Sequence, residues 1–136
     1  MPQDHREFIR RWFEEVWNQG RASAIDEMMA ADSVNHGFGE RKDMAEFKDF
    51  HTAYCDAFPN MHIQTDDIAV DGDMVAVRYS GTATHTGNGL GFAATGRPVT
   101  FRGMSFVRIV DGKIVEGWNS FDQLGMLQQL GVVPLG

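Results

Sequence analysis

Three side chains that can exchange protons stand at or near the ends of predicted strands: Asp122, His36 and His85. Carboxylates and imidazoles are common general acids and bases in enzymes. Asp122 follows a β-rich run that contains Trp118, and burial beside aromatic rings would raise the pKa of its carboxyl group toward that of a working base. Its alternative role is to cap a helix that begins at Gln123. The two histidines are candidates for the matching acid, and a solvated strand-end position is the alternative for His85.

Other kinds of chemistry have no support in the sequence. Histidine, cysteine and carboxylate residues do not occur at the spacings of a metal site, and we expect no metal and no cofactor. The glycines at 87, 89 and 91 are too closely spaced for a dinucleotide fingerprint and precede a strand instead of opening a helix. Cys55 has no neighbouring base, so we expect an inert thiol.

The residues Asp111-Gly112, between two β-rich runs, predict a two-residue hairpin turn that places Val110 opposite Lys113. Since side chains alternate between the faces of a strand, this register assigns each residue of the hairpin to one face. A bulge at Gly117 would change the faces only nearer the turn. One predicted face carries Phe101, Gly103, Ser105, Val107, Trp118 and Asp122; the other carries Arg102, Met104, Phe106, Arg108, Val110, Val115, Asn119 and Phe121.

The rest of the chain predicts helices placed ahead of an antiparallel sheet, which is an α+β arrangement. Apolar residues recur at helical spacing in the first part of the chain, and alternation with a period of two follows Asn60. A glycine-containing loop, which we expect to be mobile, joins two long hairpins. The predicted helices span 4–18, 22–31, 43–58 and 123–130, the strands 33–36, 61–68, 75–85, 100–110 and 113–122, and the loop 86–98.

Length and charge narrow the range of functions. A chain of 136 residues predicts one domain, residues 1–136. A net charge of −7 argues against nucleic acid as a partner. The single cysteine, the lack of a membrane-spanning apolar run and the charged first residues predict a cytoplasmic protein that binds no membrane.

Several short motifs in this order resemble the SnoaL-like polyketide cyclases, also called ester cyclases, which have the nuclear-transport-factor-two-like (cystatin-like) fold. The resemblance implies a cone-shaped, strongly curved antiparallel sheet wrapped round the long N-terminal helix, and a deep apolar cavity. It also implies assembly through the outer face of the sheet into a homodimer or homotetramer. The motifs are Phe13 to Gly20, Val34-Asn35-His36, Ala57-Phe58-Pro59-Asn60, Thr84 to Gly87, Thr95 to Val99, Asp111 to Glu116, and Trp118 to Gly125.

By this resemblance, the chain would close a ring in a small hydrophobic polyketide-like ligand by an intramolecular aldol reaction. Asp122 matches by position the aspartate that the family uses, and His36 and His85 fall on recurrent polar positions that line or rim the cavity. The alternatives are a non-catalytic binding module and a dehydratase or hydrolase of the same fold. A hydrogen-bonded core position is the alternative for His51. We expect the substrate to contact Trp118, Phe101, Gly103, Ser105, Trp17, Phe13, His51 and Tyr54.

Overall fold

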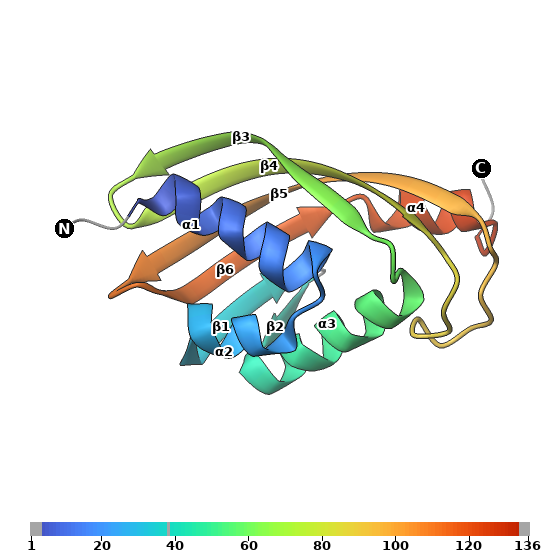
Figure 1. Ribbon diagram of the computed structural model, residues 1–136, viewed down its shortest axis with the longest axis horizontal. Coiled ribbons are helices and arrows are strands. Elements are labelled where there is room, and N and C mark those ends of the chain that lie inside the picture. The colour runs from blue at the N-terminus through green and yellow to red at the C-terminus, as the bar shows by residue number, and fades with distance from the viewer. Residues whose placement is uncertain (1–3, 38, 134–136) are drawn as a thin grey trace.

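The computed structural model describes residues 4–37 and 39–133, and shows a curved sheet with helices against its concave side (Figure 1). Within these residues the sheet has six strands in the order β2-β1-β6-β5-β4-β3. The predicted α+β class with a curved sheet is therefore confirmed. The helical elements are α1 (His5–Trp12), η1 (Phe13–Asn18), α2 (Ala22–Met28), α3 (Met44–Ala57) and α4 (Gln123–Leu130); the strands are β1 (Met29–Gly37), β2 (Glu40–Lys42), β3 (His62–Asp71), β4 (Met74–Thr84), β5 (Pro98–Val110) and β6 (Lys113–Phe121).

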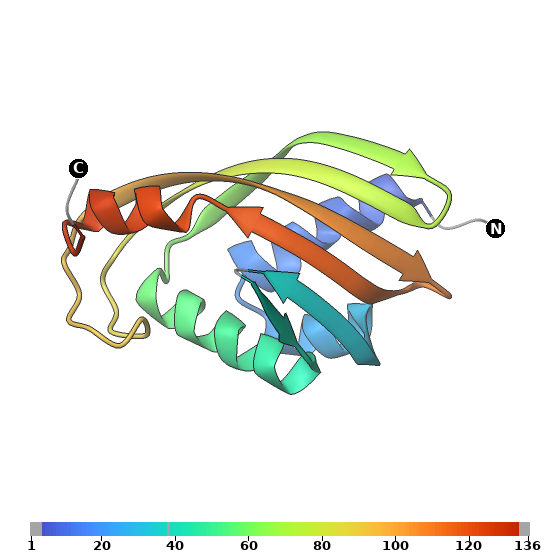
Figure 2. The ribbon, with the colours of Figure 1, turned by 180° about the vertical axis from the view of Figure 1, so that it is seen from behind.

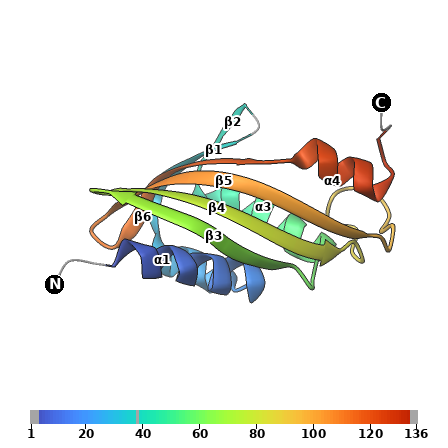
Figure 3. The same cartoon turned by 90° about the horizontal axis from the view of Figure 1, so that it is seen from above.

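The first helix packs along the concave face of the long strands (Figure 3). It begins where the Asp4 carboxylate accepts hydrogen bonds from the backbone N–H groups of Arg6 and Glu7, as the sequence predicts. Its last part, η1, is a π-helix, a wider turn that often occurs at functional sites. The Asn18 side chain ends it by bonding both the N–H and the C=O of Ile63 on β3, at 2.6 and 2.9 Å. The buried stripe that faces the sheet consists of Phe8, Ile9, Trp12, Phe13 and Val16.

Strand β1 is longer than predicted and pairs with β6 in parallel, whereas the other neighbours in the sheet are antiparallel. Helix α2 ends at Met28, three residues earlier than expected, because Met29 pairs with Ile114 and begins the strand. Figure 2 shows β1 and β2 beside α3 at one edge of the sheet. Helix α3 begins at a capping box formed by Asp43 and Glu46.

The segment between β4 and β5, which we expected to be mobile, packs against the end of α3. The backbone N–H groups of Thr86 and Gly87 both donate to the C=O of Ala57, each at 3.1 Å. A Cβ atom on Gly87 would lie 1.8 Å from the backbone oxygen of Asp56, so only glycine permits this contact. Gly87 and Gly89 therefore serve close packing against α3, and the mobility of the loop stays a prediction.

Candidate functional site

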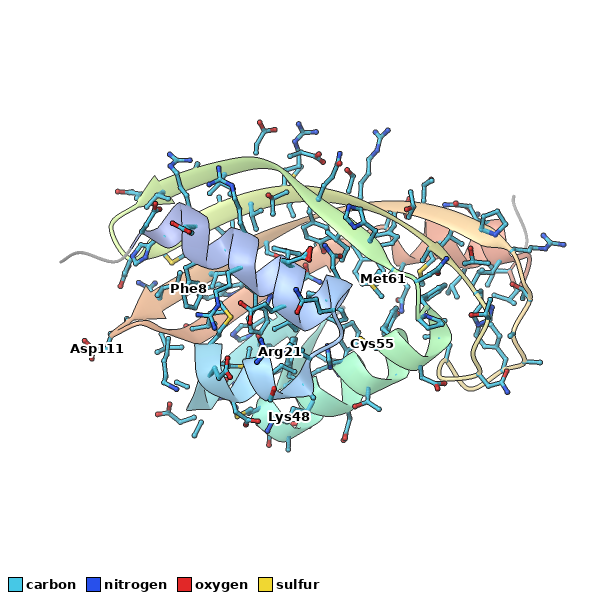
Figure 4. All side chains as sticks on the ribbon, viewed as in Figure 1. Phe8, Arg21, Lys48, Cys55, Met61 and Asp111 are labelled. Carbon is cyan, nitrogen blue, oxygen red and sulfur yellow. The ribbon has the colours of Figure 1, made fainter. Side chains whose placement is uncertain are left out.

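A cavity of about 130 Å³ lies between the concave face of the sheet and the helices. Helices provide aromatic walls such as Phe13 and Trp17, and the sheet provides Tyr79, Phe101 and Phe121. Side chains fill the space between the helices and the sheet in Figure 4, which labels Met61, one of the lining residues. The cavity is thus mainly apolar, as small-molecule sites usually are.

A bulge in β6 decides which residues face this cavity. Ile109 pairs with Ile114 but Arg108 pairs with Glu116, so Val115 is the extra residue. The predicted register is therefore correct only next to the turn, and the bulge lies at Val115 and not at Gly117, the position where the sequence left a bulge open.

The shift exchanges the two faces of β6 relative to β5. Ser105 now pairs with Asn119 and Gly103 with Phe121, so Asn119 and Phe121 lie on the concave side. Trp118 pairs with Phe106, an exposed residue on the opposite side. The prediction that Trp118 and Asp122 share a face with Phe101, and that Asn119 and Phe121 lie on the other, is wrong for this reason.

Two hydroxyl groups of the concave face meet at Asn119. Its Oδ1 atom accepts a hydrogen bond from the hydroxyl of Tyr79 at 2.6 Å and from that of Ser105 at 2.7 Å. All three residues line the cavity. Burial raises the pKa of Tyr79 to about 12, against a smaller lowering by the hydrogen bonds to Asn119 and Ser105. Tyr79 therefore remains a neutral donor at physiological pH.

Gly103 explains how a tyrosine on β4 reaches a residue on β6. A Cβ atom at position 103 would lie 2.4 Å from the Tyr79 hydroxyl, so the tyrosine ring crosses β5 over the bare glycine backbone. Gly103 itself is not among the residues that line the cavity. It supports the site by leaving room for Tyr79.

Asp122 lies outside the cavity. Its side chain is exposed, and it caps α4 by accepting a 2.9 Å hydrogen bond from the Gly125 N–H. It borders a shallow depression on the other side of the sheet together with Arg102 and Met104. The structure thus displays the capping role that the sequence offered as the alternative.

His36 stands at the rim of the cavity, at the end of β1. Its Nε2 atom lies 2.8 Å from Glu116 Oε2, and its ring stacks on Trp118 with centroids 5.4 Å apart. Glu116 and Trp118 alternate along β6 with the concave residues Gly117 and Asn119. The side chains of Glu116 and Trp118, and the His36 ring that contacts them, therefore face the convex side. His36 and Trp118 nevertheless contribute to the lining.

His85 is completely buried under the loop that follows β4. Its Nδ1 atom accepts a hydrogen bond from the Thr95 N–H at 3.0 Å, and its ring packs against Phe58 and Phe92. The Nε2 atom has no partner within residues 4–37 and 39–133. His85 does not line the cavity. Its side-chain hydrogen bonds and ring contacts within the described residues are to Thr95, Phe58 and Phe92, and not to His36 or Asp122.

The remaining predicted contacts divide into lining and supporting residues. His51 is buried, lies 2.6 Å from the Val16 carbonyl oxygen, and is not part of the lining. Tyr54 lines the cavity and accepts a hydrogen bond from the Gln123 amide at 3.1 Å, and burial raises its pKa. Of the eight predicted substrate contacts, the lining includes Phe13, Trp17, Tyr54, Phe101, Ser105 and Trp118, and it does not include Gly103 or His51.

Sequence reasoning missed Tyr79, Asn119, Asn35 and Lys42, which also line the cavity. Only the alternation of β4 gave a signal for Tyr79, and the unforeseen bulge hid Asn119. Within the described part of the chain, no carboxylate belongs to the lining, and Lys42 is the only lysine or arginine there. The same part holds no group of three or more histidine, cysteine or acidic side chains placed to bind a metal. None of its helices has the length and apolar character needed to cross a membrane.

Comparison with known proteins assigns the family. The model of the SnoaL-like polyketide cyclase family matches residues 7–130. Aklanonic acid methyl ester cyclase DnrD of Streptomyces peucetius is 28% identical over 130 residues, which cover 92% of this chain and 89% of DnrD.

Two solved structures agree with this assignment. IdmH of Streptomyces antibioticus, a candidate polyketide cyclase, has a TM-score of 0.83 and 30% identity over 96% of this chain and all of its own. AclR of Streptomyces galilaeus, a candidate hydroxylase, has a TM-score of 0.80 and 30% identity over 88% of this chain and 80% of its own. Because the family model covers nearly the whole sequence, this chain belongs to the SnoaL-like polyketide cyclase family.

Proposed function

We propose that the protein closes a ring in a polyketide-like substrate by an intramolecular aldol-type reaction, without a metal or cofactor. The observation that carries this proposal is the aromatic cavity in which the hydroxyl groups of Tyr79 and Ser105 meet at Asn119, in a chain that matches the cyclase family from residue 7 to residue 130. Such a cavity suits a flat, largely apolar molecule that carries carbonyl groups.

The reaction needs few groups from the protein. A base takes a proton from a carbon between two carbonyl groups, and the resulting carbanion attacks a third carbonyl carbon of the same molecule. The new alkoxide then takes up a proton, so the product is an isomer of the substrate. Holding the two reacting carbons in contact can lower the activation barrier by about 7–11 kcal/mol. A single general base supplies less, about 10²- to 10⁴-fold in rate.

We propose Asp122 as the base because it matches by position the aspartate of the family. It directly follows Phe121, which lines the cavity, and its cap to Gly125 uses the Oδ1 atom, so Oδ2 can take a proton. We propose His36 as the acid, since it stands at the cavity rim with Glu116 to orient its ring, whereas His85 is sealed under a loop.

The substitution Asp122→Asn tests the base. Asparagine caps a helix about as well as aspartate, so the melting temperature should change by no more than a few degrees. Turnover of aklanonic acid methyl ester, followed as an isomer of unchanged mass, should fall by at least about 10²-fold. Asp66→Asn, at an exposed aspartate of the same depression, is the matched control and should keep the wild-type rate. Wild-type turnover by Asp122→Asn would refute this mechanism.

A second candidate function is a small-molecule binding module of the same fold. The position of Asp122 favours it, because the carboxylate is exposed and already caps α4. This function predicts that the wild-type protein binds the ester but forms no isomer faster than buffer does. A product lighter by one water would instead identify a dehydratase.

A further inference from the structure

The hydrogen bonds of Asn119 leave its amide nitrogen free. A carbonyl oxygen has two lone pairs, and both are used at Oδ1 by the hydroxyls of Tyr79 and Ser105. The two N–H groups on Nδ2 have no hydrogen-bond partner within residues 4–37 and 39–133. Although it lacks a partner among these residues, the Nδ2 atom is not buried. Since Asn119 lines the cavity, we take Nδ2 to be open to the cavity.

The orientation of this amide follows from its neighbours. Two hydroxyl groups converge on one atom of Asn119, and only its oxygen can accept from both. Reversing the amide would place a donor between them and leave the phenol proton of the buried Tyr79 without that acceptor, which is costly. Tyr79 in turn is held by the ring of Phe13, 5.0 Å away, and by the backbone of Gly103. Tyr79 and Ser105 are therefore positioning residues.

We propose that Asn119 Nδ2 binds a carbonyl oxygen of an aromatic ketone that occupies the cavity, and holds the same oxygen when it becomes an enolate. The inference rests on the proposed function for the identity of the substrate class. Beyond the proposed function, the inference names the hydrogen-bond donor, Asn119 Nδ2, and the ligand atom that it binds, the carbonyl oxygen. A fixed donor aimed at developing negative charge stabilises an enolate more than it stabilises the ketone.

The matched probes are 2-acetylnaphthalene, labelled with carbon-13 at the carbonyl, and 2-ethylnaphthalene, which has a methylene group in its place. Calorimetry should show about fivefold tighter binding of the ketone, which is what one net hydrogen bond gives. The infrared carbonyl band of the bound ketone should lie at lower frequency than in hexane, because a donor weakens the C=O bond.

Asn119→Asp removes the donors but keeps an oxygen for Tyr79 and Ser105. It should abolish the preference for the ketone and return the carbonyl band toward its hexane frequency. Ser120→Asp, one residue on and exposed, adds the same charge outside the cavity and should leave both readouts unchanged. Tyr79→Phe frees the amide to turn and should broaden the band without removing its shift.

Three outcomes overturn the inference: no preference for the ketone in the wild-type protein, a bound band at the hexane frequency, or an unchanged band in Asn119→Asp. The wild-type band decides the question even if the variant fails to fold. None of these readouts needs turnover. A shifted band in a protein that forms no isomer would therefore refute the proposed cyclisation and leave the role of Asn119 standing.

Discussion

At the scale of single residues, the cavity is lined by a neutral polar group, the Asn119 amide, which bonds two hydroxyl groups. Asn119 carries no charge at any pH, and Tyr79 beside it holds its proton to a pKa of about 12. The carboxylate proposed as base lies on the other side of the sheet. In the proposed account, Asn119 binds a carbonyl group inside the cavity, whereas the proposed base is a residue outside it that directly follows the lining residue Phe121.

The raised pKa of Tyr79 predicts how stability varies with pH. The pKa of Tyr79 is about 12 in the folded protein, whereas the unfolded chain has the ordinary tyrosine pKa of 10.0, so the folded state binds more protons between these values. The stability that Tyr79 contributes is present below pH 10 and is lost as pH rises toward 12.

Urea unfolding of wild type and Tyr79→Phe checks this dependence. Near pH 7 we expect the variant to be about 1 kcal/mol less stable, because it lacks one hydrogen bond. At pH 11 the difference should shrink. A difference that grows with pH would show that the phenol is not protonated preferentially in the folded state.

At the scale of elements, one turn was predictable and one bulge was not. Asp111 and Gly112 adopt φ values of 51° and 77°, as the predicted two-residue turn requires. Gly117 suggested a bulge from its residue type, but it packs against Asn35, where a Cβ would lie 3.2 Å from the amide oxygen. The bulge lies at Val115, a residue that also fits a regular strand. The bulge lies where β6 also pairs with β1, between the partners Met29–Ile114 and Val34–Glu116, a pairing of distant segments that local sequence does not encode.

The loop between β4 and β5 provides a test at this scale. Gly87→Ala would force a methyl group against the Asp56 carbonyl, and overpacking of this kind costs about 1–3 kcal/mol. We expect a melting temperature lower by several degrees in scanning calorimetry. Ala93→Ser, at an exposed position of the same loop, should melt with the wild type. If both variants melt with the wild type, the loop does not pack on α3 as described.

At the scale of the whole molecule, the convex face of the sheet exposes large apolar side chains. Met104 and Phe106 are 63% and 56% exposed, and Trp118 lies beside Phe106. The sequence predicted apolar residues on this face. It wrongly assigned Asn119 and Phe121 to the convex face and Trp118 to the concave face. Fold class and a cavity behind the first helix followed from patterns and family resemblance. The polar centre of the cavity did not, because it joins three strands whose relative register only the folded chain fixes.

We propose, on the exposed face, a homodimer or homotetramer, since apolar patches of more than a few hundred Å² are unusual on monomers. Light scattering at micromolar concentration should give two or four times the chain mass of 15.2 kDa. Phe106→Glu should reduce it to one chain, because the charge would be buried at the interface. Leu124→Glu, at an exposed position on α4, should keep the wild-type mass. A wild-type mass of one chain would exclude both assemblies.

The most direct test of the central claim is a crystal structure with aklanonic acid methyl ester, the compound named for the relative DnrD. The account predicts that its rings lie in the cavity against Phe13 and Phe121, with a carbonyl oxygen within hydrogen-bond distance of Asn119 Nδ2. An empty cavity with the ester bound in the shallow depression beside Asp122 would contradict the account.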